Sequence, residues 1–528
     1  MPDPRTICLI ASLGLASLGA HATGLQQVLD DPAQSCPPLL HTGYAGNAEL
    51  LASLYGTSEG RPLWSDPGRL QALRSAFEAL ADDGLEPAEY LPDPFPAPSL
   101  DQPAATAACQ DLLLTRGYLD ALRHLARGRL AQRDYEPLWR EREHTGDEIR
   151  ATLALAKAGL ADPARAFEQA RPAAEQYRHL RLAYARARQE PLADWFALAS
   201  GPLLRPGMSD PRVAGLEARL QMAGYLPPAS EPATHHHPAL VNALRAFQQD
   251  HGLQADGILG PATLHELNIS PASRLHGLRA NLERWRWLAR DLEPDLLLVD
   301  IAGAQLALYR DGQAVWQTRA QVGRAGRATP QLKSTITRLT LNPTWTVPPT
   351  ILREDKLPQI RQDPEYLTRS RLQVLDFQGH PVDPATVDWN APSGVMLRQE
   401  AGPDNPLGQV AVRFANPFAI YLHDTPSQRL FASAERATSS GCVRVEAALG
   451  LVEQLLTEAE RDTVERRLAL GRTYEYRLQR PTPVLLGYWT AEADALGTAH
   501  YRPDIYRQDA ALIAALNRAM SEGRSIAR

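Results

Sequence analysis

Two short segments late in the chain contain a histidine and a cysteine whose neighbours are typical of reactive side chains. Residues 421–426 read Tyr-Leu-His-Asp-Thr-Pro, and residues 438–445 read Thr-Ser-Ser-Gly-Cys-Val-Arg-Val. His423 follows the apolar run 418–422, which is typical of the end of a strand, and Cys442 follows small residues that leave its sulfur accessible. A thiol near an imidazole supports acyl transfer, because the thiolate attacks a carbonyl while the imidazole carries the proton. A free thiol is mostly protonated at neutral pH, so the site also needs a base or a positive field to form a reactive thiolate.

The alternative interpretation is that Cys442 is a small buried hydrophobic residue and His423 a hydrogen-bonded core histidine. The neighbours of the cysteine argue against it, because Ser-Ser-Gly precedes Cys442 and Arg444 follows two positions later. Such residues are poor material for a hydrophobic core. We therefore predict that Cys442 is a nucleophile and that His423 is its general base.

The first 22 residues have the pattern of a secretory signal peptide. Arg5 precedes an apolar run at 7–18, and Ala-His-Ala at 20–22 fits an Ala-x-Ala cleavage site. The apolar run is short for a membrane span, which needs about 20 residues. We expect cleavage after Ala22, export to the periplasm, and no stable membrane span in the mature chain.

The four cysteines have different expected fates. Cys8 leaves with the signal peptide. Cys36 and Cys109 are able to form a disulfide in an oxidising compartment, which would leave Cys442 free. The sequence also allows Cys442 to pair with either of them, and that pairing would abolish its nucleophilicity.

The remainder of the chain divides into helical and strand-forming parts, which predicts a multidomain α+β fold. Helical periodicity dominates residues 23–205, a compact helical unit occupies 206–272, and strand patterns dominate 273–508. The strand pattern breaks at 353–400, and a long insertion in a β domain is typically a functional lid. Residues 509–528 are expected to form a closing helix. The net charge of −6, without a dense basic patch, argues against a nucleic-acid partner.

Two local patterns give further expectations. Asp311-Gly312 lies between the alternating segments 305–309 and 314–322, which predicts a β-hairpin. Residues 235–237 are three adjacent histidines, which cannot all face one metal from a regular element. Since no cysteine or carboxylate cluster frames them, we expect a solvated loop and no metal site.

The two segments that contain His423 and Cys442 resemble the active-site signature of the L,D-transpeptidases, whose catalytic domain is of the YkuD type. The chain is most similar to the large, multidomain YcbB-like branch of that family. Residues 61–64 (Arg-Pro-Leu-Trp) and 83–90 match the pattern of its scaffold domain, and residues 247–263 match a peptidoglycan-binding module. The resemblance implies an α-helical scaffold domain, a three-helix peptidoglycan-binding module, and a mostly-β catalytic domain with an inserted capping subdomain.

Strand geometry and the resemblance together assign roles near the nucleophile. The backbone N–H of Cys442, with that of Gly441, is predicted to bind the oxyanion. Tyr421 lies two residues before His423 and shares its face of the strand, and the resemblance implies that its hydroxyl adds an oxyanion donor. Arg444 is predicted to hold a substrate carboxylate, with a surface salt bridge as the alternative.

Two further residues complete the predicted site, and a third is excluded from it. Ser440 is placed with the substrate-binding residues, and so is Trp345, for which a core aromatic role is an equal alternative. Asp424 adjoins His423, and neighbours on a strand point to opposite faces. We therefore expect a backbone carbonyl, rather than the Asp424 carboxylate, to orient the imidazole.

The resemblance implies a function as well as a fold. Cys442 would attack the carbonyl of the third residue of a peptidoglycan stem, and an amine of a second stem would resolve the thioester into a 3→3 crosslink. The implied partners are stem peptides, glycan strands and cell-wall synthases, with carbapenems as inhibitors and no metal or cofactor. Two alternatives remain: an L,D-carboxypeptidase that uses water as acceptor, and a catalytically inactive wall-binding protein.

Overall fold

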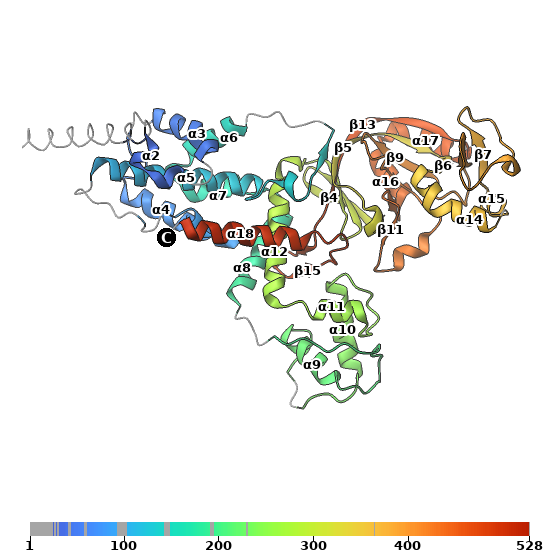
Figure 1. Cartoon of the computed structure of the whole chain (residues 1–528), viewed down its shortest axis with the longest axis horizontal. Coiled ribbons are helices and arrows are strands. Elements are labelled where there is room, and N and C mark those ends of the chain that lie inside the picture. Colours follow the sequence, from blue (N-terminus) through green and yellow to red (C-terminus); the bar gives the residue numbers. More distant parts are fainter. Residues whose placement is uncertain are drawn as a thin grey trace, which may run out of the picture.

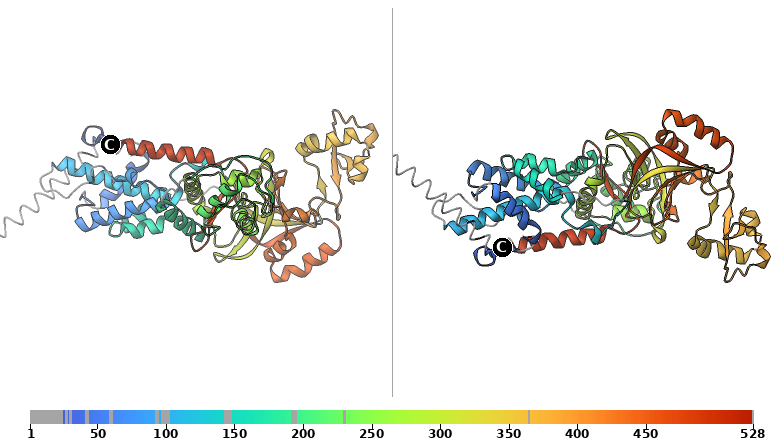
Figure 2. Two further views of the ribbon diagram at one scale, coloured as in Figure 1. Left: turned by 90° about the horizontal axis from the view of Figure 1, so that it is seen from below. Right: turned by 90° about the horizontal axis from the view of Figure 1, so that it is seen from above.

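The computed structural model describes residues 25, 28, 31–40, 44–57, 61–91, 95, 103–141, 148–190, 195–228, 231–363 and 365–526. The predicted signal peptide lies outside these residues. The molecule is elongated, with a helical region at one end and a small mixed subdomain at the other, on either side of a β domain (Figure 1, Figure 2). No helix in the described ranges has the length and apolar character needed to cross a bilayer.

The N-terminal region is a helical bundle. It comprises α2 (Pro32–Ser35), α3 (Tyr44–Thr57), α4 (Pro67–Glu78), α5 (Ala104–Arg127), α6 (Glu148–Ala158), α7 (Pro163–Ala170) and α8 (Glu175–Gln189). As the periodicity predicts, Leu70, Leu73 and Phe77 are buried on one face of α4. A disulfide joins Cys36, at the end of α2, to Cys109 in α5, with their Cα atoms 5.4 Å apart.

The second unit contains α9 (Val213–Met222), α10 (Pro238–Asp250) and α11 (Pro261–Leu267) around a core of its own. The expectation of a solvated loop at residues 235–237 was wrong for its central histidine. His236 is 1% exposed, and its Nε2–H donates to the Gly257 carbonyl at 2.8 Å. His237 caps α10, since its Nδ1 accepts from the Leu240 N–H at 3.3 Å. These histidines therefore stabilise the local fold.

Helix α12 (Pro271–Leu288) leads into the β domain, whose main sheet closes on itself. Its strands are β2 (Leu296–Asp300), β3 (Gln305–Arg310), β4 (Gln313–Gly323), β5 (Leu332–Leu341), β9 (Val410–Phe414), β10 (Leu422–His423), β12 (Val443–Val445) and β13 (Tyr474–Gly487). They pair in the order β5-β13-β2-β3-β4-β12-β10-β9, and β9 pairs again with β5. Aliphatic side chains from these strands fill the core. The mostly-β domain expected from the sequence is thus confirmed.

Additional elements surround this sheet. The predicted hairpin joins β3 to β4, and Asp311 and Gly312 both have the positive φ angles, 50° and 77°, that its tight turn requires. β11 (Ala437–Ser439) pairs with β4, and helices α16 (Ala448–Leu455) and α17 (Glu458–Ala469) follow β12.

The insertion forms a subdomain with its own hydrophobic core, which we call the cap (residues 345–399). β6 (Trp345–Thr346), β8 (Val395–Gln399) and β7 (Gln373–Asp376) form a three-stranded sheet in that order, accompanied by α13 (Pro349–Ile351), α14 (Leu357–Gln362) and α15 (Tyr366–Arg369). The cap begins before the expected residue 353, because Trp345 pairs with Gln399 across β6 and β8. It projects from the end of the molecule opposite the helical bundle (Figure 2).

The helical bundle and the β domain share a continuous buried interface. β1 (Trp139–Arg140), from the bundle region, adds to β5 in parallel. The indole of Trp285 stacks on that of Trp489 at 4.5 Å. α18 (Asp509–Ile526) crosses α12 and returns beside the bundle (Figure 1). The short hairpin of β14 (Ala491–Ala493) and β15 (Ala499–Tyr501) contacts α8. The β domain is therefore anchored at several points to the bundle.

Candidate active site

The closed sheet brings the predicted nucleophile and base to neighbouring strands. β10 and β12 pair in parallel, with Leu422 opposite Val443 and His423 opposite Arg444. Cys442 immediately precedes β12, so it lies beside the strand that ends in His423. The long sequence gap between the two residues is thus bridged by one strand pairing.

Side-chain hydrogen bonds fix the backbone of the cysteine loop. The Ser439 hydroxyl donates to the Cys442 carbonyl at 2.6 Å and accepts from the Gly441 N–H at 3.1 Å. The Thr329 hydroxyl donates to the Gly441 carbonyl at 2.7 Å. Gly441 has a φ of 117°, which a residue with a Cβ atom rarely adopts.

This arrangement corrects one expectation about the oxyanion donors. The Gly441 N–H is already bonded to Ser439, so Gly441 contributes its conformation and not a free donor. The Cys442 N–H makes no hydrogen bond within the described residues. It is the backbone donor that remains available for an oxyanion.

A backbone carbonyl orients the imidazole of His423, as strand geometry predicted. Its Nδ1 lies 2.6 Å from the Asp424 carbonyl oxygen, which can only accept, so Nδ1 carries the proton and Nε2 keeps a free lone pair. The Asp424 carboxylate points elsewhere and accepts from the Gln409 N–H at 2.8 Å. Burial, reinforced by the positive charge of Arg444, lowers the pKa of His423 to about 3. The imidazole is therefore neutral at physiological pH and able to accept a proton.

The thiol of Cys442 is also neutral in this structure. Burial raises its pKa above the ordinary value of 9.0, although Tyr421, Arg413 and Arg444 act in the opposite direction. Within the described residues the thiol donates to the Ala419 carbonyl at 3.8 Å and makes no hydrogen bond to the imidazole. A role as nucleophile therefore requires the sulfur to lose its proton as substrate reacts, which is the step predicted for His423 as general base.

Tyr421 shares the side of the strand that carries His423, as predicted. The two rings lie 5.6 Å apart, and the guanidinium of Arg413 lies 4.0 Å from the Tyr421 ring centroid. Burial raises the pKa of Tyr421, which keeps its hydroxyl protonated and able to donate. The sequence interpretation missed Arg413; its signal was a single cation within the apolar strand β9.

Arg444 faces a cavity between the β domain and the cap. The cavity, of about 600 Å³, is also lined by Ser440 and Trp345, which the sequence placed with the substrate-binding residues. Arg444 donates through Nη1 to the buried Gln321 side chain at 3.0 Å. Its Nε is buried without a partner, and within the described residues Arg444 has no carboxylate partner. The Nε–Nη2 edge is therefore free for a carboxylate, and the surface salt bridge considered as an alternative does not form.

An arginine that the sequence interpretation missed connects the cysteine loop to the cap. Arg327 donates to the Ser440 hydroxyl at 2.9 Å and pairs with Glu354 and Asp355 of the cap, each at 2.6 Å. Residues 324–327 offered only a Gly/Arg-rich turn as a signal, because the partners lie far away in the sequence. Arg327 thus makes the position of the cap and that of the cysteine loop depend on one side chain.

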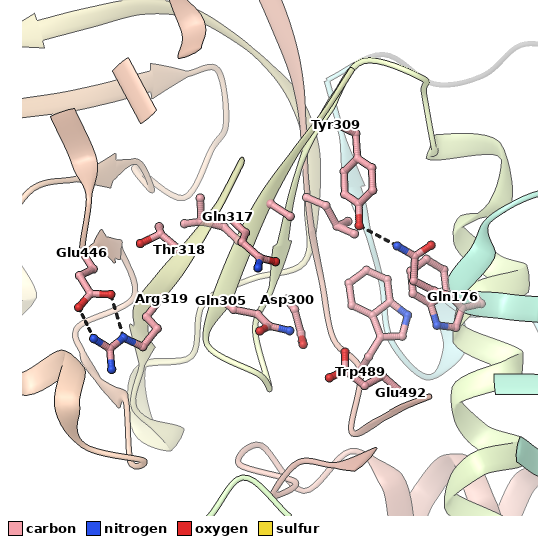
Figure 3. A pocket seen from close by; sticks show the side chains of 14 residues that line it. Gln176, Asp300, Gln305, Tyr309, Gln317, Thr318, Arg319, Glu446, Trp489 and Glu492 are labelled. Atoms are coloured by element: carbon pink, nitrogen blue, oxygen red, sulfur yellow. Dashed lines mark hydrogen bonds and ion pairs between the residues drawn. The ribbon is translucent and has the colours of Figure 1, made fainter. Parts of the chain in front are cut away.

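Another cavity, of about 520 Å³, lies on the outer side of β2, β3 and β4, facing α8 and α12 (Figure 3). Its walls include aromatic and amide side chains, but several of these already pair with each other. The Gln176 amide donates to the Tyr309 hydroxyl at 2.7 Å, and Arg319 pairs with Glu446. Asp300 also lines this cavity, and burial raises the pKa of its carboxyl to about 7. The lining contains no cysteine, so Cys442 remains the candidate nucleophile. Among the described residues no cluster of histidine, cysteine and carboxylate side chains is arranged to hold a metal ion.

Comparison with known families divides the chain into three matched parts. Residues 294–485 match the family described as "L,D-transpeptidase catalytic domain" (YkuD), residues 49–183 match a "Scaffold domain", and residues 209–267 match a "Putative peptidoglycan binding domain". The disulfide-linked bundle, the three-helix unit and the closed sheet described above correspond to the scaffold, peptidoglycan-binding and catalytic parts in turn. The three-part architecture that the resemblance implied is therefore confirmed.

Individual proteins are similar over smaller portions. A "Putative L,D-transpeptidase" of Haemophilus influenzae is 38% identical over 221 residues, which cover 40% of this chain and 44% of that protein; the chain thus spans less than half of that relative's length. A "Probable N-acetylmuramoyl-L-alanine amidase" of Bacillus licheniformis is 36% identical over 75 residues, or 14% of this chain and 21% of the relative.

Solved structures are similar to part of the chain at low identity. The L,D-transpeptidase from Mycobacterium smegmatis is 13% identical, with a TM-score of 0.17 and coverage of 37% of this chain and 58% of the other. L,D-transpeptidase 3 from Mycobacterium tuberculosis, solved with a faropenem-derived adduct, is also 13% identical, with a TM-score of 0.18 and coverage of 37% and 60%. The assignment rests on the family matches: the chain carries a YkuD-type L,D-transpeptidase catalytic domain joined to a scaffold domain and a peptidoglycan-binding domain.

Proposed function

We propose that this protein is a periplasmic L,D-transpeptidase that forms 3→3 peptidoglycan crosslinks through a thioester on Cys442. One observation carries the proposal. A free thiol and an unbonded backbone N–H lie on the loop beside the His423 strand, next to a cavity with an unpaired arginine edge. Ser440 and Arg444, which flank Cys442 in the sequence, line that cavity, so a carboxylate receptor lies next to a nucleophile and an oxyanion donor.

The acylation step uses these groups in sequence. A stem tetrapeptide enters the cavity beneath the cap, and a carboxylate of the donor stem binds the free edge of Arg444. The Cys442 sulfur forms a bond to the carbonyl carbon of the third residue while Nε2 of His423 takes the thiol proton. The Cys442 N–H, helped by the Tyr421 hydroxyl, stabilises the negative oxygen. The C–N bond to the terminal D-Ala then breaks, and His423 returns the proton to the leaving amine.

Deacylation repeats the chemistry in reverse. The side-chain amine of a second stem attacks the thioester carbon while His423 takes its proton. The C–S bond then breaks, and His423 returns the proton to the sulfur, which leaves Cys442 ready for another cycle. Water as acceptor would give the L,D-carboxypeptidase instead. We favour the amine because residues 294–485 match a family described as a transpeptidase catalytic domain, and a transpeptidase transfers its acyl group to an amine.

Export is part of the proposal. The Cys36–Cys109 disulfide supports it, because such bonds persist in oxidising compartments such as the periplasm. We also propose glycan strands as a ligand of the peptidoglycan-binding domain and cell-wall synthases as partners.

The test is to incubate the purified protein with tetrapeptide stems and to analyse the products and the adducts by mass spectrometry. We expect crosslinked dimers, D-Ala release, and a carbapenem mass increment on Cys442. Cys442→Ala should abolish all three, and His423→Gln should slow acylation by about 10²–10⁴-fold. Asp424→Asn is the matched control for His423, because that side chain points away from the imidazole; its activity should stay within a few-fold of the wild type.

Three outcomes would contradict the proposal in different ways. Crosslinking by Cys442→Ala would show that Cys442 is not the nucleophile, and a wild type that forms neither products nor adducts would favour the wall-binding alternative. Tripeptides without dimers, at saturating acceptor concentration, would identify the carboxypeptidase.

A further inference from the structure

A third cavity lies far from Cys442, where the peptidoglycan-binding domain meets the rest of the protein. It has a volume of about 660 Å³, and its walls come from α8 of the scaffold, from α9 and α10, from the start of α12 and from β15. Figure 1 shows the α9–α11 unit beside β15 and below α8 and α12. The cavity is therefore composite: the three-helix domain supplies only part of it.

The most unusual group in this cavity is the guanidinium of Arg219 on α9. Arg219 is 6% exposed, and its Nε and Nη2 atoms are buried without any hydrogen-bond partner. The side chain is held between aromatic rings, 5.0 Å from the Trp195 centroid and 4.8 Å from that of Phe196. Within the described ranges no carboxylate pairs with it. A buried cation that lacks a counter-charge is costly, so its retention indicates an anionic ligand.

The acidic side chains of the cavity do not pair with Arg219. Asp250 accepts from the Tyr225 hydroxyl at 2.9 Å and faces His500 at 3.4 Å, while Glu266 pairs with Arg274 at 2.7 Å. Two principal acids of the cavity are therefore already committed to other partners.

The scaffold contributes a second cation to the same cavity. Arg186 on α8 donates to the Leu496 carbonyl and, within the part of the chain the structure describes, forms no ion pair. Glu190, at the exposed end of α8, is the remaining acid on this wall and is not paired with either arginine. The α8 and α9 walls thus each present a guanidinium without a carboxylate.

Aromatic rings packed against one another form another part of the cavity wall. Phe247, His251 and Tyr501 stack in series, with centroid distances of 3.8 and 5.3 Å. His251 is uncharged, because burial lowers its pKa to about 3. The guanidinium of Arg274 lies 4.3 Å from the Tyr501 centroid, so these rings form a wall of the cavity without a free stacking face. The contacts available to a carboxylate come from the guanidinium groups.

We propose that this cavity binds a carboxylate of peptidoglycan, with Arg219 as its anchor and Arg186 as a second contact. Two parts of peptidoglycan carry that group: the peptide stems, and the lactyl groups of muramic acid in glycan strands whose stems have been removed. Because α8 and β15 help to form the site, ligand binding would also hold the peptidoglycan-binding domain against the scaffold and catalytic domains. The site goes beyond the proposed transfer reaction, and the choice of peptidoglycan as its ligand rests on the proposed function of the peptidoglycan-binding domain.

The test measures binding by the full chain to three probes. These are a tetrapeptide stem with free carboxylates, the same stem with every carboxylate converted to an amide, and glycan strands stripped of their stems by an amidase. The variants are Arg219→Gln, Arg186→Gln and, as a matched control, Arg245→Gln, an exposed arginine of α10 outside the cavity. Thermal melting establishes that each variant is folded, and Arg219→Lys retains the charge if the Gln variant fails that check.

We expect Arg219→Gln to weaken binding of one carboxylate probe by about tenfold or more, since a hydrogen bond to a charged group is lost. Arg186→Gln should have a smaller effect, and Arg245→Gln none. The carboxylate probe whose binding weakens in Arg219→Gln identifies the part of peptidoglycan that supplies the carboxylate. The amidated stem should bind all variants equally. Equal binding by Arg219→Gln and Arg245→Gln with both carboxylate probes would overturn the site. The two variants would also bind equally if stems bound only at the catalytic cavity. This result would therefore not count against the proposed transfer reaction.

Discussion

The protonation state of Cys442 can be measured directly, and it decides how the nucleophile is activated. A free cysteine with a pKa of about 8.5 is roughly 3% thiolate at pH 7. Burial raises the pKa of Cys442 above 9.0, so its thiolate fraction at pH 7 is at most about 1%. Without substrate, Cys442 should therefore react with iodoacetamide at least about threefold more slowly than free cysteine at pH 7, apart from steric effects.

The assay is the rate of alkylation as a function of pH, followed by mass spectrometry of the intact mature chain. Since Cys36 and Cys109 are joined, Cys442 is the reacting thiol. The rate should rise through one inflection above pH 9, and Arg413→Gln should move that inflection higher, because the guanidinium lowers the thiol pKa.

His423→Gln provides the decisive comparison. A neutral imidazole does not stabilise a thiolate by charge, so this variant should keep nearly the same inflection while losing acylation. A plateau of reactivity below pH 7 that disappears in His423→Gln would instead show a resting thiolate–imidazolium pair. That result would refute a resting state in which both the thiol and the imidazole are neutral.

Three further predictions concern stability and the cap. Because the pKa of His423 falls from 6.5 to about 3 on folding, the unfolded state binds the proton first as the pH drops. The free energy of unfolding of the wild type should therefore fall by up to ~5 kcal/mol between pH 6.5 and 3. Urea titrations of His423→Gln over the same pH range should not show this decrease. Replacing Cys36 and Cys109 by alanine opens a loop closed over 73 positions and should lower the free energy of unfolding by about 4 kcal/mol; a difference below 1 kcal/mol would contradict it. Arg327→Gln should speed amide exchange at residues 349–362 several-fold without changing the melting temperature of the scaffold; unchanged exchange would show that its ion pairs do not hold the cap.

Local chemistry could be predicted from the sequence where neighbours along one strand decide it. The opposite directions of His423 and Asp424, and the shared face of Tyr421 and His423, follow from the two-residue period of a strand. The hairpin at Asp311-Gly312 follows from turn residues that accept positive φ. In each case the deciding interactions lie within a few residues.

The remaining features depend on groups that meet only after the sheet closes. The Ser439 hydroxyl removes the Gly441 N–H from the oxyanion site, which the run of small residues before Cys442 does not reveal. Arg327 reaches the cap across more than twenty residues of sequence, and β1 joins β5 from another domain. The burial that makes Cys442 neutral is likewise a property of the assembled fold and not of its flanking residues.

The electrostatics of the site suggest why a resting pair of neutral groups is useful. Arg444 lowers the pKa of His423, which opposes formation of the imidazolium that acyl transfer requires. A substrate carboxylate on the free edge of Arg444 would offset that charge and make the imidazolium less costly. Binding a correct donor stem would then raise the basicity of His423 at the moment when the thiol must lose its proton. In an empty site the same arginine keeps the imidazole a weak base, so the thiol stays protonated and reacts more slowly with oxidants.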